Sequence, residues 1–108
     1  MKEMQNIPGN LNTKDLKEYL EKNKDFLYQK YHLKKIGFFG SFARGEQDTG
    51  SDVDIIVEFE NNTSNLYELK MELRNYLKKE LNRDVDIARE KYLKVRIKEK
   101  IISEAIFV

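Results

Sequence analysis

Apolar residues recur every three or four positions along the first third of the chain, which is the spacing of an amphipathic helix. These positions are Leu16, Tyr19, Leu20, Phe26, Leu27 and Tyr31. Thr13 stands where an N-cap is expected, so the pattern predicts helix from Thr13 to about His32. Asn23 interrupts the pattern, and the sequence leaves open whether the segment forms one helix or two.

The rest of the chain alternates between short apolar runs, which are typical of strands, and longer helical patterns. Strands are predicted at 36–39, 53–59, 85–88 and 105–108, and helices at 64–82 and 90–102. Ser64 is the expected cap of the first of these helices, and Asn82 is expected to end it. The elements predict an α+β domain, a small mixed β-sheet with flanking helices. We expect one domain at 13–108 after a flexible lead-in at 1–12.

Two acidic residues, Asp52 and Asp54, stand at the start of a predicted strand that is otherwise apolar. Residues two apart in a strand share a face, so the two carboxylates should project together. Like charges on a half-buried strand are unfavourable unless a cation or a proton intervenes, and buried acids are rarely left unpaired. Carboxylate ligation suits a hard divalent ion such as Mg²⁺, which also binds phosphate oxygens.

The glycine-rich turn before this strand could hold such phosphates. Gly40 follows the apolar run 36–39 and precedes Ser41, and Gly45 and Gly50 follow in the same loop. Each feature also has an ordinary interpretation, since glycines serve turns and Asp52 could be a solvent-exposed strand end. Considered together, the turn and the paired acids favour a site that binds a metal and an anion.

The combined motif is Gly40-Ser41-Phe42-Ala43-Arg44-Gly45, five residues, then Ser51-Asp52-Val53-Asp54-Ile55. It resembles the signature of the minimal nucleotidyltransferase branch of the DNA polymerase beta-like superfamily, and it matches at each defined position. Short motifs recur by chance, but two of them at the correct spacing after a strand are specific. The resemblance implies the DNA polymerase beta-like nucleotidyltransferase fold.

The resemblance also implies a third carboxylate on a neighbouring strand, between two apolar residues. Asp86, in Val85-Asp86-Ile87, matches this description. Asp84 has the same parity and is the alternative, but it lies beside Arg83 at the strand entrance, where a surface ion pair is expected.

What the resemblance implies is transfer of a nucleoside monophosphate, AMP if the donor is ATP, with release of pyrophosphate. Asp52, Asp54 and Asp86 would be catalytic and would hold two Mg²⁺ ions, or Mn²⁺ in their place. Gly40 and Ser41 would bind the triphosphate. Arg44 could contact phosphate or brace the turn through a carboxylate, and Ser51 could cap the strand or bind phosphate.

Composition narrows the setting of this chemistry. Twenty basic and 19 acidic residues give a formal net charge of +1, so there is no global bias toward nucleic acid or a membrane. The absence of cysteine fits a reducing, cytoplasmic environment. The basic residues at 89–100 alternate with glutamates and aliphatics and are expected to form a solvated helix face. Phe42 is a candidate to line the nucleotide pocket.

At 108 residues the chain is expected to form one domain, so we expect the acceptor surface to come from elsewhere. Minimal members of the resembled family often pair with HEPN-domain toxins and transfer AMP to a toxin tyrosine. The first hypothesis is therefore an antitoxin that adenylylates a HEPN-type partner with ATP as donor. A homo-oligomer could also build an acceptor surface. The alternative is a non-catalytic nucleotide-binding module that neutralises a partner by contact alone.

Overall fold

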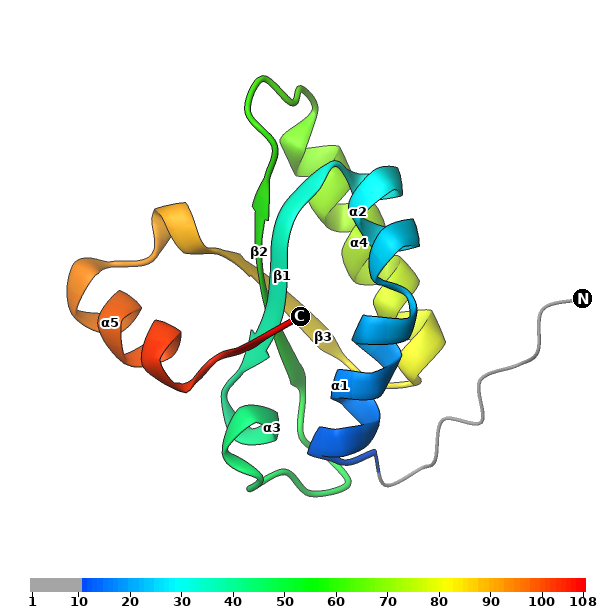
Figure 1. The fold of residues 1–108 in the computed structure, drawn as a ribbon. Helices are drawn as coiled ribbons and strands as arrows, with labels where there is room; N and C mark the ends of the chain where they lie inside the picture. Colours follow the sequence, from blue (N-terminus) through cyan, green and yellow to red (C-terminus); the bar gives the residue numbers. More distant parts are fainter. Residues whose placement is uncertain (1–10) are drawn as a thin grey trace, which may run out of the picture.

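A four-stranded mixed β-sheet forms the centre of the computed structural model, which describes residues 11–108 (Figure 1). The strands are β1 (Leu33–Phe39), β2 (Val53–Phe59), β3 (Val85–Arg89) and β4 (Ile106–Phe107). Their order is β3-β2-β1-β4. The pairs β1–β2 and β1–β4 are antiparallel, and β2–β3 is parallel. The predicted α+β architecture with one mixed sheet is confirmed.

Three helices cover one face of the sheet (Figure 1). They are α1 (Thr13–Lys22), α2 (Lys24–Tyr31) and α4 (Leu66–Leu81). Asn23 separates α1 from α2, which answers the question that the sequence left open. The cap of α1 is Asn12, whose Oδ1 accepts the Asp15 N–H at 2.8 Å, so the prediction of Thr13 was one residue late. Of the expected lead-in, residues 1–10 lie outside the described part of the chain.

Alternate residues of each strand divide the sheet into an apolar face and a mixed face, as a pleated strand requires. Val53, Ile55, Val57 and Phe59 of β2 belong to the main hydrophobic core beneath the helices. Asp54 and Glu58, of opposite parity, therefore project to the other face. The acidic side chains of β2 therefore lie on the face of the sheet opposite the three helices.

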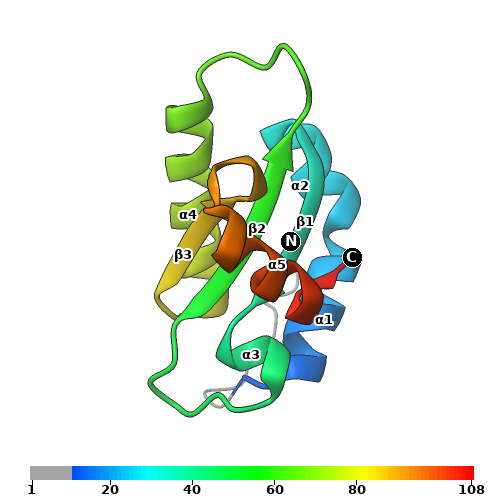
Figure 2. The ribbon, with the colours of Figure 1, turned by 90° about the vertical axis from the view of Figure 1, so that its left-hand side faces the viewer.

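The second face is crossed by α5 (Val95–Glu104), which lies in front of the sheet in Figure 2. The prediction of one helix over 90–102 was wrong. A 3₁₀ turn, η1 (Glu90–Tyr92), comes first, and Leu93 and Lys94 are extended before α5 begins. Leu93 matched the helical spacing, but its N–H closes the 3₁₀ turn on the Glu90 carbonyl at 3.2 Å.

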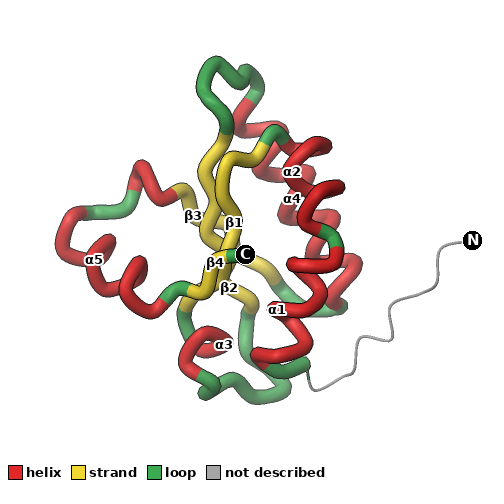
Figure 3. The backbone as a smooth tube through the Cα atoms, in the orientation of Figure 1, coloured by secondary structure: helices red, strands yellow, loops and turns green. Residues whose placement is uncertain are grey.

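Shorter elements complete the architecture. Ser64 is not the cap of α4; Asn65 takes that position, and Asn82 ends the helix as predicted. The short α3 (Ser41–Arg44) lies at the lower end of the sheet in Figure 3, where loops join β1 to β2. No helix in the described range is long and apolar enough to cross a membrane.

Candidate functional site

The parallel pairing of β2 with β3 brings two predicted site residues together. In the register of these strands, Asp54 is the direct partner of Asp86. Asp52 comes one residue before β2 and has the same parity as Asp54, so all three belong to the face that α5 crosses. Asp84 instead forms an exposed ion pair with Lys78, with Nζ and Oδ1 3.4 Å apart. Asp86 is therefore the better-placed third carboxylate.

Asp54 is the carboxylate of this group whose pKa is raised by its surroundings. Burial raises the pKa of its carboxyl, and the neighbouring Asp86 and then Asp52 raise it further. Arg44 acts in the opposite direction but does not cancel these effects. A cation bound beside Asp54 would relieve both the desolvation and the repulsion.

The three carboxylates lie on one face of the sheet, but their side chains do not converge on a common metal position. Among residues 11–108, no three acidic, histidine or cysteine side chains stand close enough together to hold a metal ion. Asp52 and Asp86 are exposed, so rotation about their side-chain bonds is unhindered by packing. Binding a metal would require these two side chains to turn toward Asp54.

Gly40 lets the turn after β1 approach Asp54 closely. Its backbone has φ 73° and ψ −148°, a region that essentially only glycine occupies. A Cβ at this position would overlap Oδ2 of Asp54. The Gly40 carbonyl accepts the N–H groups of Ala43 and Arg44, and the two preceding N–H groups head the first turn of α3 without an intrahelical acceptor. Those N–H groups are suited to an anion.

Phe42 does not line this site. Its side chain is fully buried in the hydrophobic core, and the Arg83 guanidinium stacks over its ring at 5.3 Å. The expectation that Phe42 contacts a nucleotide was therefore wrong, since one turn of α3 directs the ring inward. Phe42 instead anchors α3 to the sheet.

Arg44 is held by two carboxylates. Its Nε donates to Glu46 at 2.9 Å, and its Nη1 donates to Glu104 of α5 at 3.2 Å. The sequence left two roles open for Arg44, and in the structure it braces the turn by pairing with carboxylates. The brace connects α3 to the C-terminal end of α5, and sequence reasoning could not foresee the partner 60 residues away.

The loop that enters β2 is closed by Ser51 and Arg83. The Ser51 hydroxyl accepts the Asp48 N–H at 2.9 Å and lies 3.2 Å from Asp48 Oδ1. Arg83 donates from Nη1 to the carbonyls of Asp48 and Ser51, each at 3.0 Å. Ser51 thus orders the approach to Asp52. Arg83 was missed because no motif marks it.

A cleft of about 450 Å³ opens between α3 and α5, next to Gly40. It is lined by Phe39, Gly40, Arg44, Arg96, Ile97, Lys100, Ile101 and Glu104. Arg96 and Lys100 were expected to belong to a solvated helix face. Their spacing of four residues places both on one side of α5, which was the available signal.

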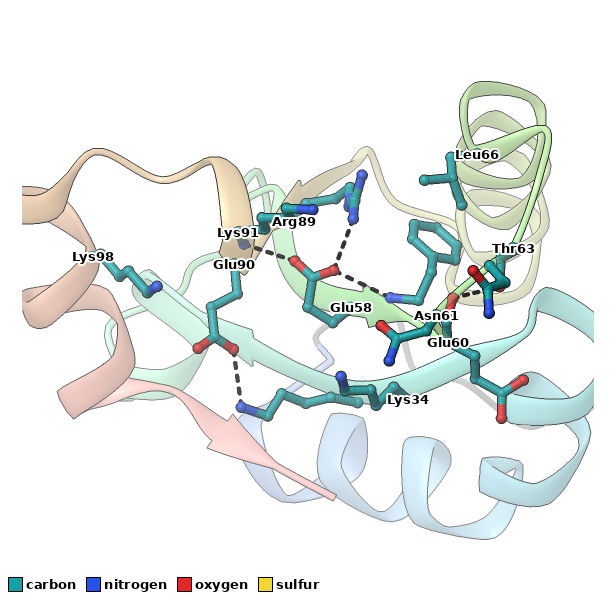
Figure 4. Close-up of a pocket in the computed structure, with 13 residues that line it drawn as sticks. Lys34, Glu58, Glu60, Asn61, Thr63, Leu66, Arg89, Glu90, Lys91 and Lys98 are labelled. Atoms are coloured by element: carbon teal, nitrogen blue, oxygen red, sulfur yellow. Dashed lines mark hydrogen bonds and ion pairs between the residues drawn. The ribbon is translucent and has the colours of Figure 1, made fainter.

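A second cavity, of about 520 Å³, lies at the other end of the same face (Figure 4). This cavity is larger than the cleft, but many of the charged residues that line it pair with one another. Glu58 accepts from Arg89 Nη2 at 2.9 Å and from the Lys91 N–H at 2.7 Å, and Lys35 pairs with Glu90 at 2.9 Å. Burial favours a higher pKa for Glu58, but the hydrogen bonds from Lys91 and Arg89 outweigh it, and the pKa is lowered. This end resembles a structural network more than a reactive site.

Comparison with known proteins agrees with the geometry. The family model for the nucleotidyltransferase domain matches residues 16–108. A Methanocaldococcus jannaschii protein, provisionally named a protein adenylyltransferase, is 43% identical over 93 residues, which are 82% of this chain and 93% of that protein. A solved structure described provisionally as a minimal nucleotidyltransferase has a TM-score of 0.74 at 30% identity, covering 89% of this chain and 95% of that one. The crystal structure of a toxin–antitoxin with AMP-PNP has a TM-score of 0.65 at 25% identity, covering 81% of this chain and 70% of that one.

Proposed function

The chain belongs to the nucleotidyltransferase-domain family, and we propose that it transfers AMP from ATP to a tyrosine of a HEPN-type toxin, for which it is the antitoxin. The observation that carries the catalytic part is the register of β2 and β3, which sets Asp54 beside Asp86. The Gly40 turn adjoins the same carboxylate. Acidic side chains that can hold metal ions, next to a turn whose N–H groups can bind phosphate, are recurring parts of phosphoryl-transfer sites.

The donor set fits a divalent metal ion. Asp52, Asp54 and Asp86 offer only carboxylate oxygens, which magnesium and manganese prefer. The crowded charge around Asp54 also gives a bound cation a favourable electrostatic site. We assign these three residues as ligands, with two Mg²⁺ ions as the working hypothesis. Such ions would supply charge neutralisation at the phosphoryl group and the leaving pyrophosphate.

The protein groups have separate tasks in the proposed reaction. The first N–H groups of α3 and the Ser41 hydroxyl orient the triphosphate. The acceptor hydroxyl oxygen forms a bond to the α-phosphorus, and the bond from that phosphorus to the bridging oxygen breaks, which releases pyrophosphate. Asp86 is exposed and unobstructed, so it is the group we assign to receive the hydroxyl proton. Arg44 and Ser51 hold the surrounding turn and loop.

The choice of acceptor is supported by relatives. One relative carries the name of a protein adenylyltransferase, and one neighbour in fold is a toxin–antitoxin with AMP-PNP. The sequence resemblance to the nucleotidyltransferases of HEPN pairs points the same way. The proposed acceptor is therefore a tyrosine hydroxyl presented by the partner protein.

One observation favours the alternative of a module that masks its partner without catalysis. The three carboxylates are not converged, and the Arg44 charge is engaged by Glu46 and Glu104. A protein that only binds its partner would need neither group for chemistry. The two functions differ in whether AMP is transferred from ATP to the partner protein.

The test is transfer of label from α-labelled ATP, with Mg²⁺, to the co-expressed partner protein. The wild type should label the partner, and the double variant Asp52→Asn/Asp54→Asn should not. Asp86→Asn should also abolish transfer, whereas the matched Asp84→Asn should retain it because Asp84 is a surface ion-pair residue. If the partner is neutralised without being labelled, and the double variant neutralises it equally well, the masking function is established instead.

A further inference from the structure

The cleft between α3 and α5 lies next to the carboxylates, and Gly40 borders both. Gly40 contributes to the cleft wall and also abuts Asp54. A triphosphate with its α-phosphate at the carboxylates could therefore extend past the Gly40 turn into the cleft. The part of the ligand that enters would be its terminal phosphates.

The charge of the cleft matches those phosphates. Three basic residues and one acid line it, Arg44, Arg96, Lys100 and Glu104, which leaves an excess of two positive charges. The Arg44 charge is taken up by Glu46 and Glu104. Within residues 11–108, neither Arg96 nor Lys100 is assigned an ion pair with a carboxylate. These two side chains are the cations available for a ligand.

The position of α5 is fixed at its C-terminal end. Glu104 is tied to α3 through Arg44, and the chain continues directly into β4 at the sheet edge. Figure 2 shows α5 lying across the sheet with α3 beneath it. Arg96 and Lys100 thus face the cleft from an element that is already docked, which lowers the cost of ordering them around an anion.

The remaining walls of the cleft are apolar. Phe39, Ile97 and Ile101 line it beside the two cations. Apolar side chains beside a cation reduce its contact with water, which strengthens charge-assisted hydrogen bonds to phosphate oxygens. A nucleoside base could also contact such walls, but a neutral base would leave the two cations without a partner.

We propose that Arg96 and Lys100 bind the β- and γ-phosphates of the nucleoside triphosphate, the portion released as pyrophosphate. This inference rests on the proposed function for the identity of the ligand. It assigns recognition of the triphosphate tail to α5, in addition to the Gly40 turn. Discrimination between ATP and AMP then arises partly on this helix.

The experiment measures binding by titration calorimetry in Mg²⁺ to the full chain. The ligands are ATP, inorganic tripolyphosphate and AMP. The test variant is Arg96→Gln/Lys100→Gln. The control Lys94→Gln/Lys98→Gln removes the same charge from α5 and its cap, at residues that do not line the cleft. All four positions are on the surface or half-exposed, so both variants should fold, which thermal unfolding checks.

We expect the test variant to bind ATP and tripolyphosphate at least about tenfold more weakly, as loss of charge-assisted contacts predicts. AMP binding should change less than about twofold, and the control should bind all three ligands as the wild type does. Unchanged ATP affinity in the test variant would overturn the proposal. So would a wild type that does not bind tripolyphosphate, or a parallel loss of AMP affinity, which would place the nucleoside in the cleft.

Label transfer in the same variants separates this inference from the proposed function. If the wild type transfers no label while the test variant loses tripolyphosphate affinity, the phosphate site stands and the transferase assignment fails. If the wild type transfers label and the test variant does so with an unchanged KM for ATP, the transferase assignment stands and the phosphate site fails. The expected result is transfer with a KM raised about tenfold or more.

Discussion

Strand β2 carries two half-buried carboxylates on one face, and their surroundings are opposite. Burial and the neighbouring Asp86 and Asp52 raise the pKa of Asp54. At the other end of the strand, burial alone would raise the pKa of Glu58, but the hydrogen bonds from Lys91 and Arg89 lower it. Like charges are left facing each other at one end and opposite charges are paired at the other (Figure 4).

The contrast separates the end of the sheet where we propose the active site from an end where the charges are paired. Carboxylates that repel each other do not stabilise the fold, and such a group in a polar face is typical of a functional site. Glu58 accepts hydrogen bonds from Arg89 and from the Lys91 N–H, which connects β2 to β3 and η1. Changes at Asp54 should therefore affect chemistry, and changes at Glu58 should affect stability.

The largest expected effect is on transfer in Asp54→Asn. If Asp54 binds metal as proposed, its loss removes several kcal/mol of transition-state stabilisation, so the rate of AMP transfer should fall roughly 1000-fold. The free energy of unfolding should not decrease, because the substitution also removes like-charge repulsion. Radiolabel transfer and urea unfolding measure the two quantities. A destabilised variant that still transfers AMP would contradict the division of β2 into two ends.

Gly40→Ala tests whether the turn must approach Asp54 this closely. The side chain would combine an unfavourable backbone conformation with overlap of the Asp54 carboxylate, and we expect a loss of about 2 kcal/mol in stability together with loss of transfer. Gly45→Ala is the matched control. Gly45 also has a positive φ, but an added Cβ would meet nothing within 4 Å.

The control should cost only about 1 kcal/mol and should retain transfer. Urea unfolding and the labelling assay compare the two alanine variants directly. Equal stability and equal activity in both would mean that the overlap with Asp54 has no consequence.

Glu58→Gln should have the reverse profile of Asp54→Asn. It leaves Arg89, whose side chain is 11% exposed, without a charged partner, and the free energy of unfolding should fall by about 1–2 kcal/mol. Glu60→Gln changes an exposed acid directly after the same strand and should alter stability by less than about 0.5 kcal/mol. AMP transfer should persist in both variants. A transfer defect in Glu58→Gln without a stability change would place catalysis at both ends of the sheet.

The elements of the sheet and the carboxylate cluster were accessible from the sequence for physical reasons. Strand parity puts Asp52 and Asp54 on one face, and a short apolar run places Asp86 on a strand. The choice of Asp86 over Asp84 as the third carboxylate came from the family resemblance. Tertiary partners were not accessible, because nothing local links Arg44 to Glu104 or Arg83 to the loop before Asp52. Phe42 was misplaced for the same reason, since only the packing of α3 decides where its ring points.

The smallest expected effect is in the pH dependence of stability, measured by urea unfolding between about pH 3 and pH 7 without divalent ions. A raised pKa means that folded Asp54 holds its proton more tightly than the unfolded chain does. Its contribution is therefore fully present below the unfolded value, about 4, and is lost as pH rises through the folded pKa. Asp54→Asn should gain stability relative to the wild type over that rise.

Glu58 has the opposite sign, because its pKa is lowered in the folded protein. Its contribution is present above the unfolded value, also about 4, and is lost as pH falls through the folded pKa. The deficit of Glu58→Gln should therefore be greatest near neutral pH and should shrink in acid. The two variants should diverge from the wild type in opposite directions as pH rises. A common direction would show that the two ends of β2 do not differ electrostatically.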